Sequence, residues 1–571
     1  MKMKTWRRGG VLLFCFVLAG VFASTVYGDE GDPPARVARL SFAQGKVSFQ
    51  PSGETTWSEA SVNRPMTTGD RIYTDPGGSA ELEVGPFAVR ISGATDVTLA
   101  NLNDQLMQLG VGQGSLRVTV YEMPPNNSVE VDTPNGALVL QSAGSYRVDT
   151  AADGNSTQVT VNAGSLQITA GDLSKSLQSG QAVKLTGTGP VMASDASVPP
   201  PDDFDRWCAG RDQRVENSPS VKAVGPGVPG DEDLDSHGVW TEKPDYGRVW
   251  VPSDVPAGWV PYRYGHWVFI EPWGWTWVEA EPWGYAPFHY GRWARIGPVW
   301  FWVPGPVVRP VYAPALVAFV GGPGFGVGIG IGVQAWFPLG PREPYNPWYH
   351  YGPHYGREIG AFGGTNYSNI HYANREAAFT AVSGEAFRGG QPVQQGLVHM
   401  SPDRISRAEV IPHPEVSPSS RAVFGAREVA APPVRAGRYV GGAGAPAGLR
   451  TSAPPPREAM RTSAPPNTPP QVYSHNAPGA EGSRPGGPPV SPFPRVFTRN
   501  SPAPTNAPLA ARQDAYRSDP GRPLEPQQMS NLRQGKPAGP THDRENPPHP
   551  APQHTQSKSS SSSSHGDNKK H

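Results

Sequence analysis

Three glutamates lie among aromatic rings in the stretch EPWGWTWVEAEPWGYAPFHYGRW, which runs from Glu271 to Trp293. Glycoside hydrolysis needs two carboxyl groups at a controlled separation. By residue type, any two of Glu271, Glu279 and Glu281 could supply them. Glu279 and Glu281 would lie on one face of a strand, and no carboxylate at a distant position stands out as a partner. The alternative is a solvent-facing strand edge opposite a tryptophan face. The sequence predicts no catalytic residue and no enzyme.

Histidines could instead hold a metal ion. His350 and His354 are spaced as i and i+4, but Gly352 and Pro353 between them prevent the helix that would bring them together. Three further histidines lie in the same region: His266, His289 and His371. No carboxylate or cysteine has a spacing that would complete a ligand set. We expect hydrogen-bonded histidines in an aromatic core, with no metal and no cofactor.

The aromatic rings are the remaining candidates for a functional role. Trp and Tyr faces hold cations and stack on the apolar faces of sugars. A Pro/Gly-rich domain with few Leu or Ile residues must also build its core from rings, because each buries a large area. We expect paired rings in the core and rings in the PWG bends at the surface, where bends lie. The candidate ligand platform is Trp273, Trp283, Tyr285 and Tyr290.

The N-terminus has the form of a signal peptide. A basic start, MKMKTWRRGG, precedes sixteen uncharged, mostly apolar residues, Val11 to Val26. Ala23 or Gly28 would be the last residue before cleavage, so residues 1–28 are predicted to be the signal peptide. An uncleaved anchor is the alternative, since sixteen residues fall just short of a spanning helix. Both readings predict an extracytoplasmic protein, in the periplasm, at the cell surface or secreted.

The amino-acid composition argues against several classes of protein. The chain has 571 residues and two cysteines, and Cys15 lies in the predicted signal, so Cys208 has no partner for a disulfide. The formal net charge is zero, which removes the electrostatic case for nucleic-acid binding. Gly and Pro, 67 of each, make up nearly a quarter of the chain. Much of its length therefore cannot be packed core.

Residues 36–190 alternate apolar and polar residues with a period of two. Short runs such as VSF at 47, LRVTV at 116 and VTV at 159 are separated by turn signals such as DPGG at 75 and TPNG at 133. Strands at this spacing indicate an all-β sandwich or barrel-like domain. The sequence therefore predicts a β domain that folds alone.

The same region resembles FecR-type domains. The similarity is carried by GDRIYTDPGGSAELE and by the later block VEVDTPNGALVLQSAGSYRVDT. FecR itself is a membrane-spanning regulator of a sigma factor, with a cytoplasmic segment before its helix and a periplasmic domain that receives a signal. Here only ten residues precede the apolar run, too few for a module that binds a sigma factor. The resemblance implies the sensory-domain fold without the regulatory function.

A linker and a tryptophan-rich region follow. Residues 191–235 are rich in Pro, Gly and charge and predict a linker with a short helical stretch around 204–215. Residues 236–400 predict a second β domain, and thirteen of the sixteen tryptophans lie between 236 and 350. YGHWVFIEPWGWTWV at 264 repeats as YGRWARIGPVWFWV at 290, with a weaker echo, YGRVWVP, at 246. Repeats this short must share a core.

The uncharged run VAFVGGPGFGVGIGIGVQAWFPLG at 317–340 is long enough for a membrane span. Its FGVGIGIGV segment alternates Gly with large apolar residues, which favours a buried strand. The region as a whole resembles a tryptophan-rich domain of unknown function found after FecR-type domains in secreted bacterial proteins. WVPYRYGHWVFIEPWGWTWVEAEPWGYAPFHYGRW and AWFPLGPREPYNPWYHYGPHYGREI carry this resemblance.

Residues 401–431 form a short transition segment, and residues 432–571 are rich in Pro, Gly, Ala, Ser and Arg. Such a composition predicts a disordered tail. Two functions from different classes remain. The first is a non-enzymatic extracytoplasmic interaction or envelope-structural protein, with an envelope protein as the partner. The second is a glycan- or cell-wall-binding module that uses exposed rings to bind a polysaccharide.

Overall fold

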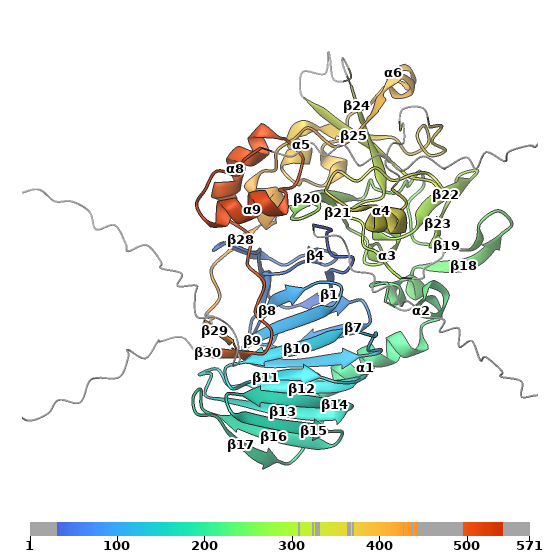
Figure 1. Cartoon of the computed structure of the whole chain (residues 1–571). Coiled ribbons are helices and arrows are strands. Elements are labelled where there is room, and N and C mark those ends of the chain that lie inside the picture. The colour runs from blue at the N-terminus through green and yellow to red at the C-terminus, as the bar shows by residue number, and fades with distance from the viewer. Residues whose placement is uncertain are drawn as a thin grey trace, which may run out of the picture.

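A computed structural model describes most of the chain (Figure 1). The described residues are 31–225, 227–305, 309–322, 325, 332–361, 367, 370–425, 427–434, 438–441 and 495–540. Strands predominate, which confirms the all-β prediction. The predicted signal peptide lies outside the described residues. Among the helices that the structure describes, none is long and apolar enough to span a membrane.

The first domain, called here the N-domain, comprises residues 38–196. Its strands are β1 (Ala38–Gln44), β2 (Val47–Gln50), β3 (Trp57–Glu59), β4 (Pro65–Met66), β5 (Arg71–Thr74), β6 (Ser79–Val84), β7 (Phe87–Ile91), β8 (Thr95–Leu102), β9 (Leu106–Val120), β10 (Ser128–Thr133), β11 (Gly136–Leu140), β12 (Gly144–Thr150), β13 (Ser156–Ala163), β14 (Ser165–Ala170), β15 (Leu173–Gln178), β16 (Gln181–Thr186) and β17 (Met192–Ala196). Each apolar alternation cited for residues 36–190 lies in one of these strands. The strand prediction for this region is confirmed.

Two sheets enclose the core of the N-domain. One runs β4-β1-β6-β7-β9-β12-β13-β16-β17. The other runs β3-β2-β5-β8-β9-β10-β11-β14-β15. Both sheets contain β9, which passes from one to the other near Gly114, where φ is 91°. A Cβ atom at Gly114 would lie 2.5 Å from the Cα of Thr95, so glycine permits this crossing.

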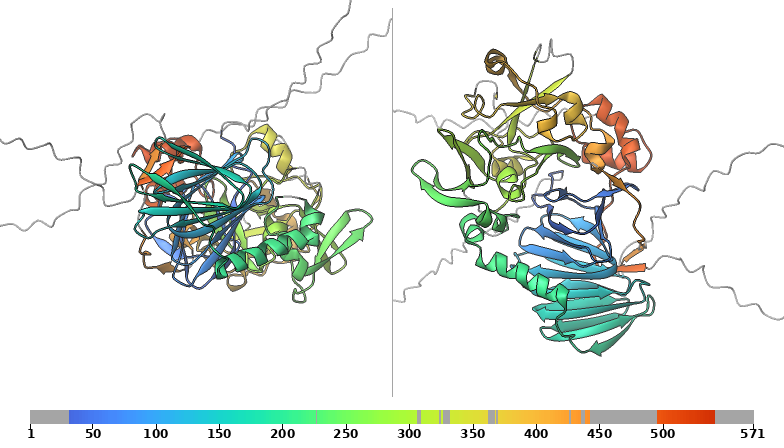
Figure 2. Two further views of the ribbon diagram at one scale, coloured as in Figure 1. Left: turned by 90° about the horizontal axis from the view of Figure 1, so that it is seen from below. Right: turned by 180° about the vertical axis from the view of Figure 1, so that it is seen from behind.

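Helices follow the N-domain where a linker was predicted: α1 (Asp203–Asn217), α2 (Pro219–Val224) and the 3₁₀ helix η1 (Glu232–Ser236). The first of them lies along one sheet of the N-domain (Figure 2). Neighbouring strands of that sheet place Arg90, Arg117 and Arg147 side by side. Asp205 and Asp212 of α1 pair with these arginines. The helical part of the predicted linker is therefore bound to the N-domain, because buried arginines require acidic partners.

The second domain, called here the Trp-domain, comprises residues 238–425. Its strands are β18 (Gly238–Lys243), β19 (Gly247–Pro252), β20 (Gly265–Ile270), β21 (Gly274–Glu279), β22 (Arg292–Ile296), β23 (Val299–Val303), β24 (Val317–Gly321), β25 (Val333–Pro338), β26 (Thr380–Ser383) and β27 (Glu409–Ile411). Its helices are α3 (Tyr285–His289), α4 (Pro353–Ile359), α5 (Gly384–Arg388), η3 (Val393–Gln395), α6 (Pro402–Arg407) and α7 (Ser420–Phe424). The strands form three sheets, ordered β18-β19-β23-β22, β20-β21 and β26-β25-β24-β27.

The repeats at 264 and 290 correspond to the hairpins β20–β21 and β22–β23. The weaker echo at 246 lies in the turn and second strand of a third hairpin, β18–β19, so it is not in register with them. Each of the three hairpins pairs two tryptophans across its strands: Trp240 with Trp250, Trp267 with Trp277, and Trp293 with Trp302. Each also has a glycine two residues before its first tryptophan, at positions 238, 265 and 291. A Cβ atom at any of these glycines would lie 2.4–2.7 Å from the indole ring of the facing strand. The repeated G-x-W therefore makes room for the indole of the opposite strand.

The paired rings form the core of the Trp-domain. Trp275, Trp277 and Trp302 are 0% exposed and Trp300 is 6% exposed. Thr276, between the first two, is also 0% exposed, so β21 is buried on both faces rather than one. The paired rings of WTW at 275 and WFW at 300 thus lie in the core, as expected for paired rings.

The uncharged run at 317–340 contributes β24 and β25, which pair with each other in one sheet. The prediction of buried strands holds for these two segments. Most of the FGVGIGIGV segment, residues 326–331, lies outside the described residues.

The C-terminal region corrects one prediction. Residues 495–540, called here the strap, were expected to be disordered but form β30 (Arg495–Thr498), α8 (Leu509–Ser518) and α9 (Pro526–Arg533). The preceding β29 (Arg438–Gly441) pairs with β30, and β28 (Glu428–Val429) adds to β3 of the N-domain. The strap runs beside the N-domain up to the Trp-domain (Figure 1). Residues 442–494 and 541–571 of the predicted tail lie outside the described residues.

We expect Trp277→Ala to lower the free energy of unfolding by about 3–5 kcal/mol, because it leaves a cavity among packed rings. Val239→Ala is the matched control, since Val239 lies on β18 of another repeated hairpin but is 58% exposed. It should change stability by about 0.5 kcal/mol or less. Denaturant titration followed by circular dichroism measures both. Equal effects would contradict the core role of Trp277.

Candidate functional site

The four rings of the predicted ligand platform are buried. Trp273 is 1% exposed, Trp283 and Tyr285 are 0% exposed, and Tyr290 is 7% exposed. The expectation that the PWG bends present exposed rings is therefore wrong. Pro282 of the second bend is exposed, but the indole of Trp283 beside it points into the core.

The contacts of these rings explain their burial. Trp283 lies 5.0 Å from Trp250 and 5.9 Å from Trp259 between ring centroids. Trp273 makes an edge contact with Tyr312 at 5.2 Å. Tyr285 lies under the guanidinium of Arg39, which comes from the N-domain. Three of the four, Trp273, Tyr285 and Tyr290, contact Tyr312 inside the core, so they are brought together but form no exposed platform.

The three glutamates of the same stretch have separate partners. Glu271 accepts hydrogen bonds from the Tyr516 hydroxyl at 2.6 Å and from the backbone N–H of Leu524, both in the strap. Glu279 accepts one from the Trp277 indole at 2.9 Å and is 3% exposed. Burial raises the pKa of both carboxyls, that of Glu279 to about 8. The alternative of a solvent-facing edge is thus wrong for Glu279.

The histidines are separate as well. His289 Nδ1 lies 2.8 Å from the carbonyl oxygen of Ala313, and burial lowers the pKa of His289 to about 3. His350 lies outside α4, which begins at Pro353 and contains His354. A hydrogen-bonded histidine in an aromatic core, as predicted, is found at His289.

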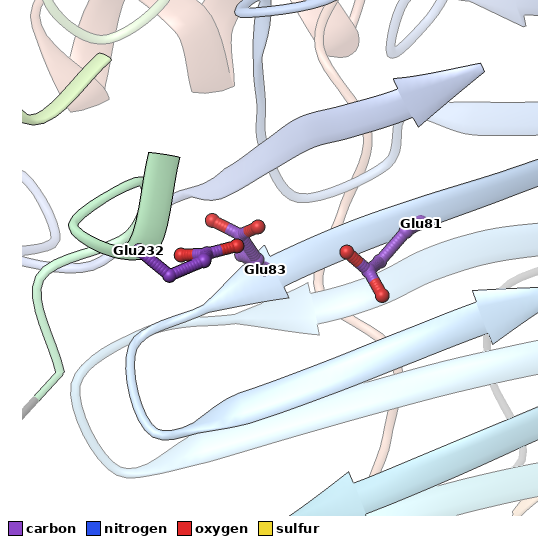
Figure 3. Close-up of side chains that lie close together, drawn as sticks. All are labelled: Glu81, Glu83 and Glu232. Atoms are coloured by element: carbon purple, nitrogen blue, oxygen red, sulfur yellow. The ribbon is translucent and has the colours of Figure 1, made fainter. Parts of the chain in front are cut away.

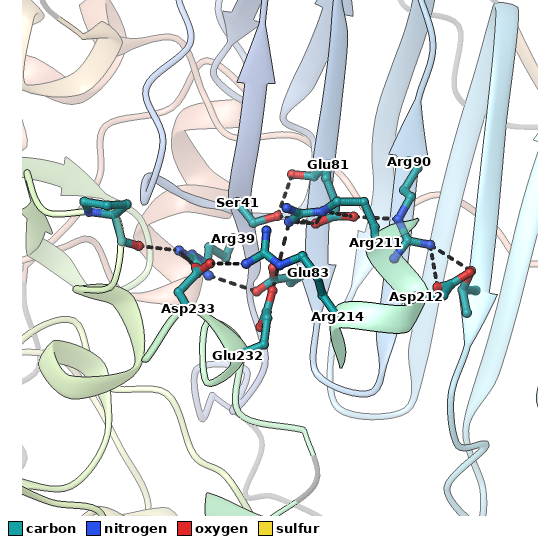
Figure 4. Close-up of polar contacts among 12 residues, drawn as sticks. Arg39, Ser41, Glu81, Glu83, Arg90, Arg211, Asp212, Arg214, Glu232 and Asp233 are labelled. Atoms are coloured by element: carbon teal, nitrogen blue, oxygen red, sulfur yellow. Dashed lines mark hydrogen bonds and ion pairs between the residues drawn. The ribbon is translucent and has the colours of Figure 1, made fainter. Parts of the chain in front are cut away.

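A network of ion pairs joins the N-domain to α1 and η1, the helices that precede the Trp-domain (Figure 4). Arg39 of β1 is 0% exposed and pairs with Glu83 at 3.1 Å and with Asp233 of η1 at 2.6 Å. It also donates to the carbonyl oxygen of Pro282 and to the Asn63 side chain. These carboxylates outweigh desolvation and raise the pKa of Arg39. One buried cation thus connects the N-domain, η1 and the bend between β21 and α3.

Three carboxylates of this network, Glu81, Glu83 and Glu232, have oxygens within 4.8 Å of one another (Figure 3). Among the described residues they form the one group with the composition of a metal site. Glu81 already pairs with Arg90 and Arg211, and Glu83 pairs with Arg39. A metal ion there would face these guanidinium groups. The cluster therefore fits an ion-pair network better than a metal centre.

Three cavities surround the segment Asp32–Val37, where the N-domain, the Trp-domain and the strap meet. The segment is held by its Ala35 backbone, whose N–H donates to Asp104 and whose carbonyl accepts from Tyr312. Arg36 donates to Asn103 and lines two of the cavities. The largest cavity, called here the junction groove, has a volume of about 420 Å³.

Proline and aromatic rings dominate the walls of the junction groove. Its walls come from residues 31–33, 346–351 and 522–526, together with Pro272, Pro412 and His413. Trp348 and Tyr349 are buried in the wall, while Tyr351 is half-buried. Asp32, His350 and Arg522 add a few polar groups at its sides. The groove therefore combines rings with several polar and charged side chains, which can orient a ligand.

Two of the four predicted platform residues line the smaller cavities. Trp273 lines one of about 300 Å³ with Glu271 and Arg533. Tyr290 lines one of about 350 Å³ with Arg309. Trp283 and Tyr285 line none of the three.

Residues 231–343 match a family of unknown function (DUF6600). This match agrees with the resemblance noted for the tryptophan-rich region and covers η1 through β25. No curated protein matches the chain. Two crystal structures of a putative anti-sigma factor from Parabacteroides distasonis match 22% of the chain at 12% identity, with a TM-score of 0.20. The matched region spans 60% of that protein, and so low a TM-score carries no argument. The resemblance of the N-domain to FecR-type domains stays a prediction.

Sequence reasoning missed the junction groove and the ion-pair network. The groove combines segments several hundred residues apart, and no local pattern marks them as neighbours. The network did leave a signal, since Arg39, Glu81 and Arg90 interrupt apolar strands of the N-domain. A charge inside such a strand indicates a paired partner elsewhere.

Arg39→Ala is expected to lower the free energy of unfolding by about 3–5 kcal/mol, because it leaves buried carboxylates unpaired. Arg206→Ala is the control, since Arg206 also pairs with an aspartate but is 64% exposed. Its loss should cost about 1 kcal/mol at most. Thermal or denaturant unfolding of the full chain measures both. Similar costs for the two variants would contradict the role of Arg39 at the junction.

The pKa of Glu279 predicts a pH dependence of stability. The folded pKa, about 8, lies above the usual value of 4.5, so the folded state binds the proton more tightly. This contribution is fully present below pH 4.5 and is lost as the pH rises through about 8. Glu279→Gln cannot ionise, so its stability relative to the wild type should rise between pH 5 and pH 8. Parallel curves of unfolding free energy against pH would contradict the prediction.

Proposed function

We propose that this chain is a non-enzymatic extracytoplasmic interaction or envelope-structural protein. In this proposal the N-domain is a FecR-type domain that does not itself regulate a sigma factor, and the junction groove is the binding site. The extracytoplasmic location rests on the signal-peptide pattern of residues 1–28.

The junction groove is the observation that carries the proposal. Its walls include six prolines, Trp348, Tyr349 and Tyr351, whose rings lose little conformational entropy when a ligand binds. The groove lies between the Trp-domain, residues 31–33 and the strap. Hydrogen bonds from Tyr516 and Leu524 of the strap to Glu271 hold the strap against the Trp-domain, so the groove is pre-formed. An envelope protein that offers an extended segment with both apolar and polar side chains fits such walls, as in the aromatic-lined grooves that bind extended peptides.

The alternative is a glycan- or cell-wall-binding site in the cavity of about 300 Å³. The observation that favours it is the combination of Trp273 with Glu271, Asn506 and Arg533 around that cavity. A ring beside several hydrogen-bonding groups suits a sugar. Only 1% of Trp273 is exposed, which leaves little ring face for stacking and makes the junction groove the stronger candidate.

His350→Trp should fill the exposed mouth of the junction groove and lower binding to solubilised envelope proteins at least tenfold. His371→Trp is the matched control, because His371 is also exposed but does not line the groove. Retention of the full mature chain on immobilised envelope proteins and on purified peptidoglycan measures the two alternatives. Equal retention of both variants would contradict the groove, and retention on peptidoglycan alone would favour the glycan site.

A further inference from the structure

The cavity of about 350 Å³, called here the proline cavity, is distinct from the junction groove and from the cavity beside Trp273. It lies between residues 35–37, the turn from β6 to β7, the loop after β9 and residues 309–310. Its volume is within the range of about 300–1,000 Å³ that is usual for small-molecule sites. Prolines are rigid and apolar, so they can hold the apolar part of a ligand. Five of them line the cavity: Pro86, Pro124, Pro125, Pro229 and Pro310.

Arg36 brings a cation to the proline cavity without a paired carboxylate. Its guanidinium donates to the carbonyl oxygen of Asn103 at 2.6 Å and to the side-chain oxygen of Asn127 at 2.9 Å, and both of these acceptors are neutral. Within the described part of the chain Arg36 forms no ion pair, whereas Arg39 and Arg90 each pair with carboxylates. Burial lowers the pKa of Arg36 to about 10, as expected for a cation with too little counter-charge.

The acidic residues that line the cavity do not neutralise Arg36. Asp104 Oδ1 accepts a hydrogen bond at 2.7 Å from the backbone N–H of the residue before Arg36, and Asp104 Oδ2 pairs with Arg309 at 2.8 Å. Arg309 also lies 3.8 Å from Glu358. Glu122 is exposed, so water screens its charge. One positive charge, that of Arg36, is therefore left without a partner.

Tyr290 brings a hydroxyl group that also lacks a partner. The residue is 7% exposed and lines the proline cavity. Its backbone carbonyl accepts a hydrogen bond from the Trp302 indole, but its hydroxyl forms none with the residues that the structure describes. Because a buried hydroxyl normally has a hydrogen-bond partner, an acceptor inside the cavity would satisfy it.

We propose that the proline cavity binds a small organic carboxylate, whose oxygens accept hydrogen bonds from Arg36 and Tyr290 and whose apolar body packs on the proline rings. A carboxylate carries one negative charge and accepts several hydrogen bonds, which matches one unpaired cation and one hydroxyl donor. A phosphate group carries about 1.5–2 charges and would exceed that single cation beside Asp104 and Glu122. The site is independent of the proposed function.

The probes are three acids with compact apolar bodies: benzoate, cyclohexanecarboxylate and N-acetylproline. Their primary amides are matched controls, because they have nearly the same shape but no charge. Binding to the full mature chain at neutral pH is measured by ligand-observed NMR titration. We expect at least one acid to bind, and its amide to bind at least tenfold more weakly, because the charged hydrogen bonds are about twice as strong as neutral ones.

Tyr290→Phe removes only the hydroxyl. It should lower the affinity for the acid at least tenfold, since a hydrogen bond to a charged group contributes about 1.5–3 kcal/mol. The Tm should not fall, because the hydroxyl has no partner to lose. Tyr246→Phe is the matched control and should bind as the wild type does, since Tyr246 is half-buried and does not line the cavity.

Arg36→Gln should also lower the affinity at least tenfold, because it removes the unpaired charge. Tyr290→Phe decides the outcome if Arg36→Gln fails to fold, since Arg36 also donates to Asn103 and Asn127. The proposal would be overturned if no acid binds with a Kd below roughly 10 mM, or if the amides bind as tightly as the acids. Wild-type affinity in Tyr290→Phe would overturn it as well.

Discussion

Arg39 is a wholly buried cation, and the arrangement of the two domains depends on how it is paired. Moving a guanidinium out of water is costly, so it must be surrounded by carboxylates and carbonyl oxygens. Glu83 is the only one of its acidic partners within the N-domain; Asp233 and the Pro282 carbonyl come from the chain that leads into and through the Trp-domain. The pairing therefore helps to fix where the Trp-domain lies, together with hydrogen bonds from Asn63 and Arg64 of the N-domain to the carbonyl oxygens of Glu281 and Val423. Apolar contacts are less directional than hydrogen-bonded ion pairs, so on their own they would allow more than one arrangement of the two domains.

The core of the Trp-domain is built mainly from aromatic rings. Rings replace aliphatic side chains, and glycines let each hairpin accept an indole from its own second strand. The same packing removes the PWG rings from the surface, because rings this large fill the space beneath a bend. The aromatic residues therefore serve mainly to stabilise the domain. A ring can contact a ligand only where it lines a cavity, as Trp273 and Tyr290 do.

The strap is held by carboxylates spaced along the body of the protein. Glu130, Glu54 and Glu271 accept backbone N–H groups of Arg499, Leu509 and Leu524 in turn. These carboxylates bind backbone N–H groups, which every residue except proline has. A segment of low-complexity composition can therefore be ordered without specific side chains at these positions. The strap also provides a wall of the junction groove through residues 522–526, so the C-terminal region takes part in the candidate site.

The sequence by itself determined the strands of residues 36–190, the repeated hairpins and the scaffold role of Trp275 and Trp277. These depend on side-chain alternation and local turn residues, which act over a few positions. Only the tertiary structure decided that Trp273 and Trp283 are buried, that residues 203–224 and 495–540 are packed rather than free, and that three distant segments enclose the junction groove. These features depend on which surfaces meet. The burial of a bend or a polar segment is set by a partner hundreds of residues away, which no local periodicity encodes.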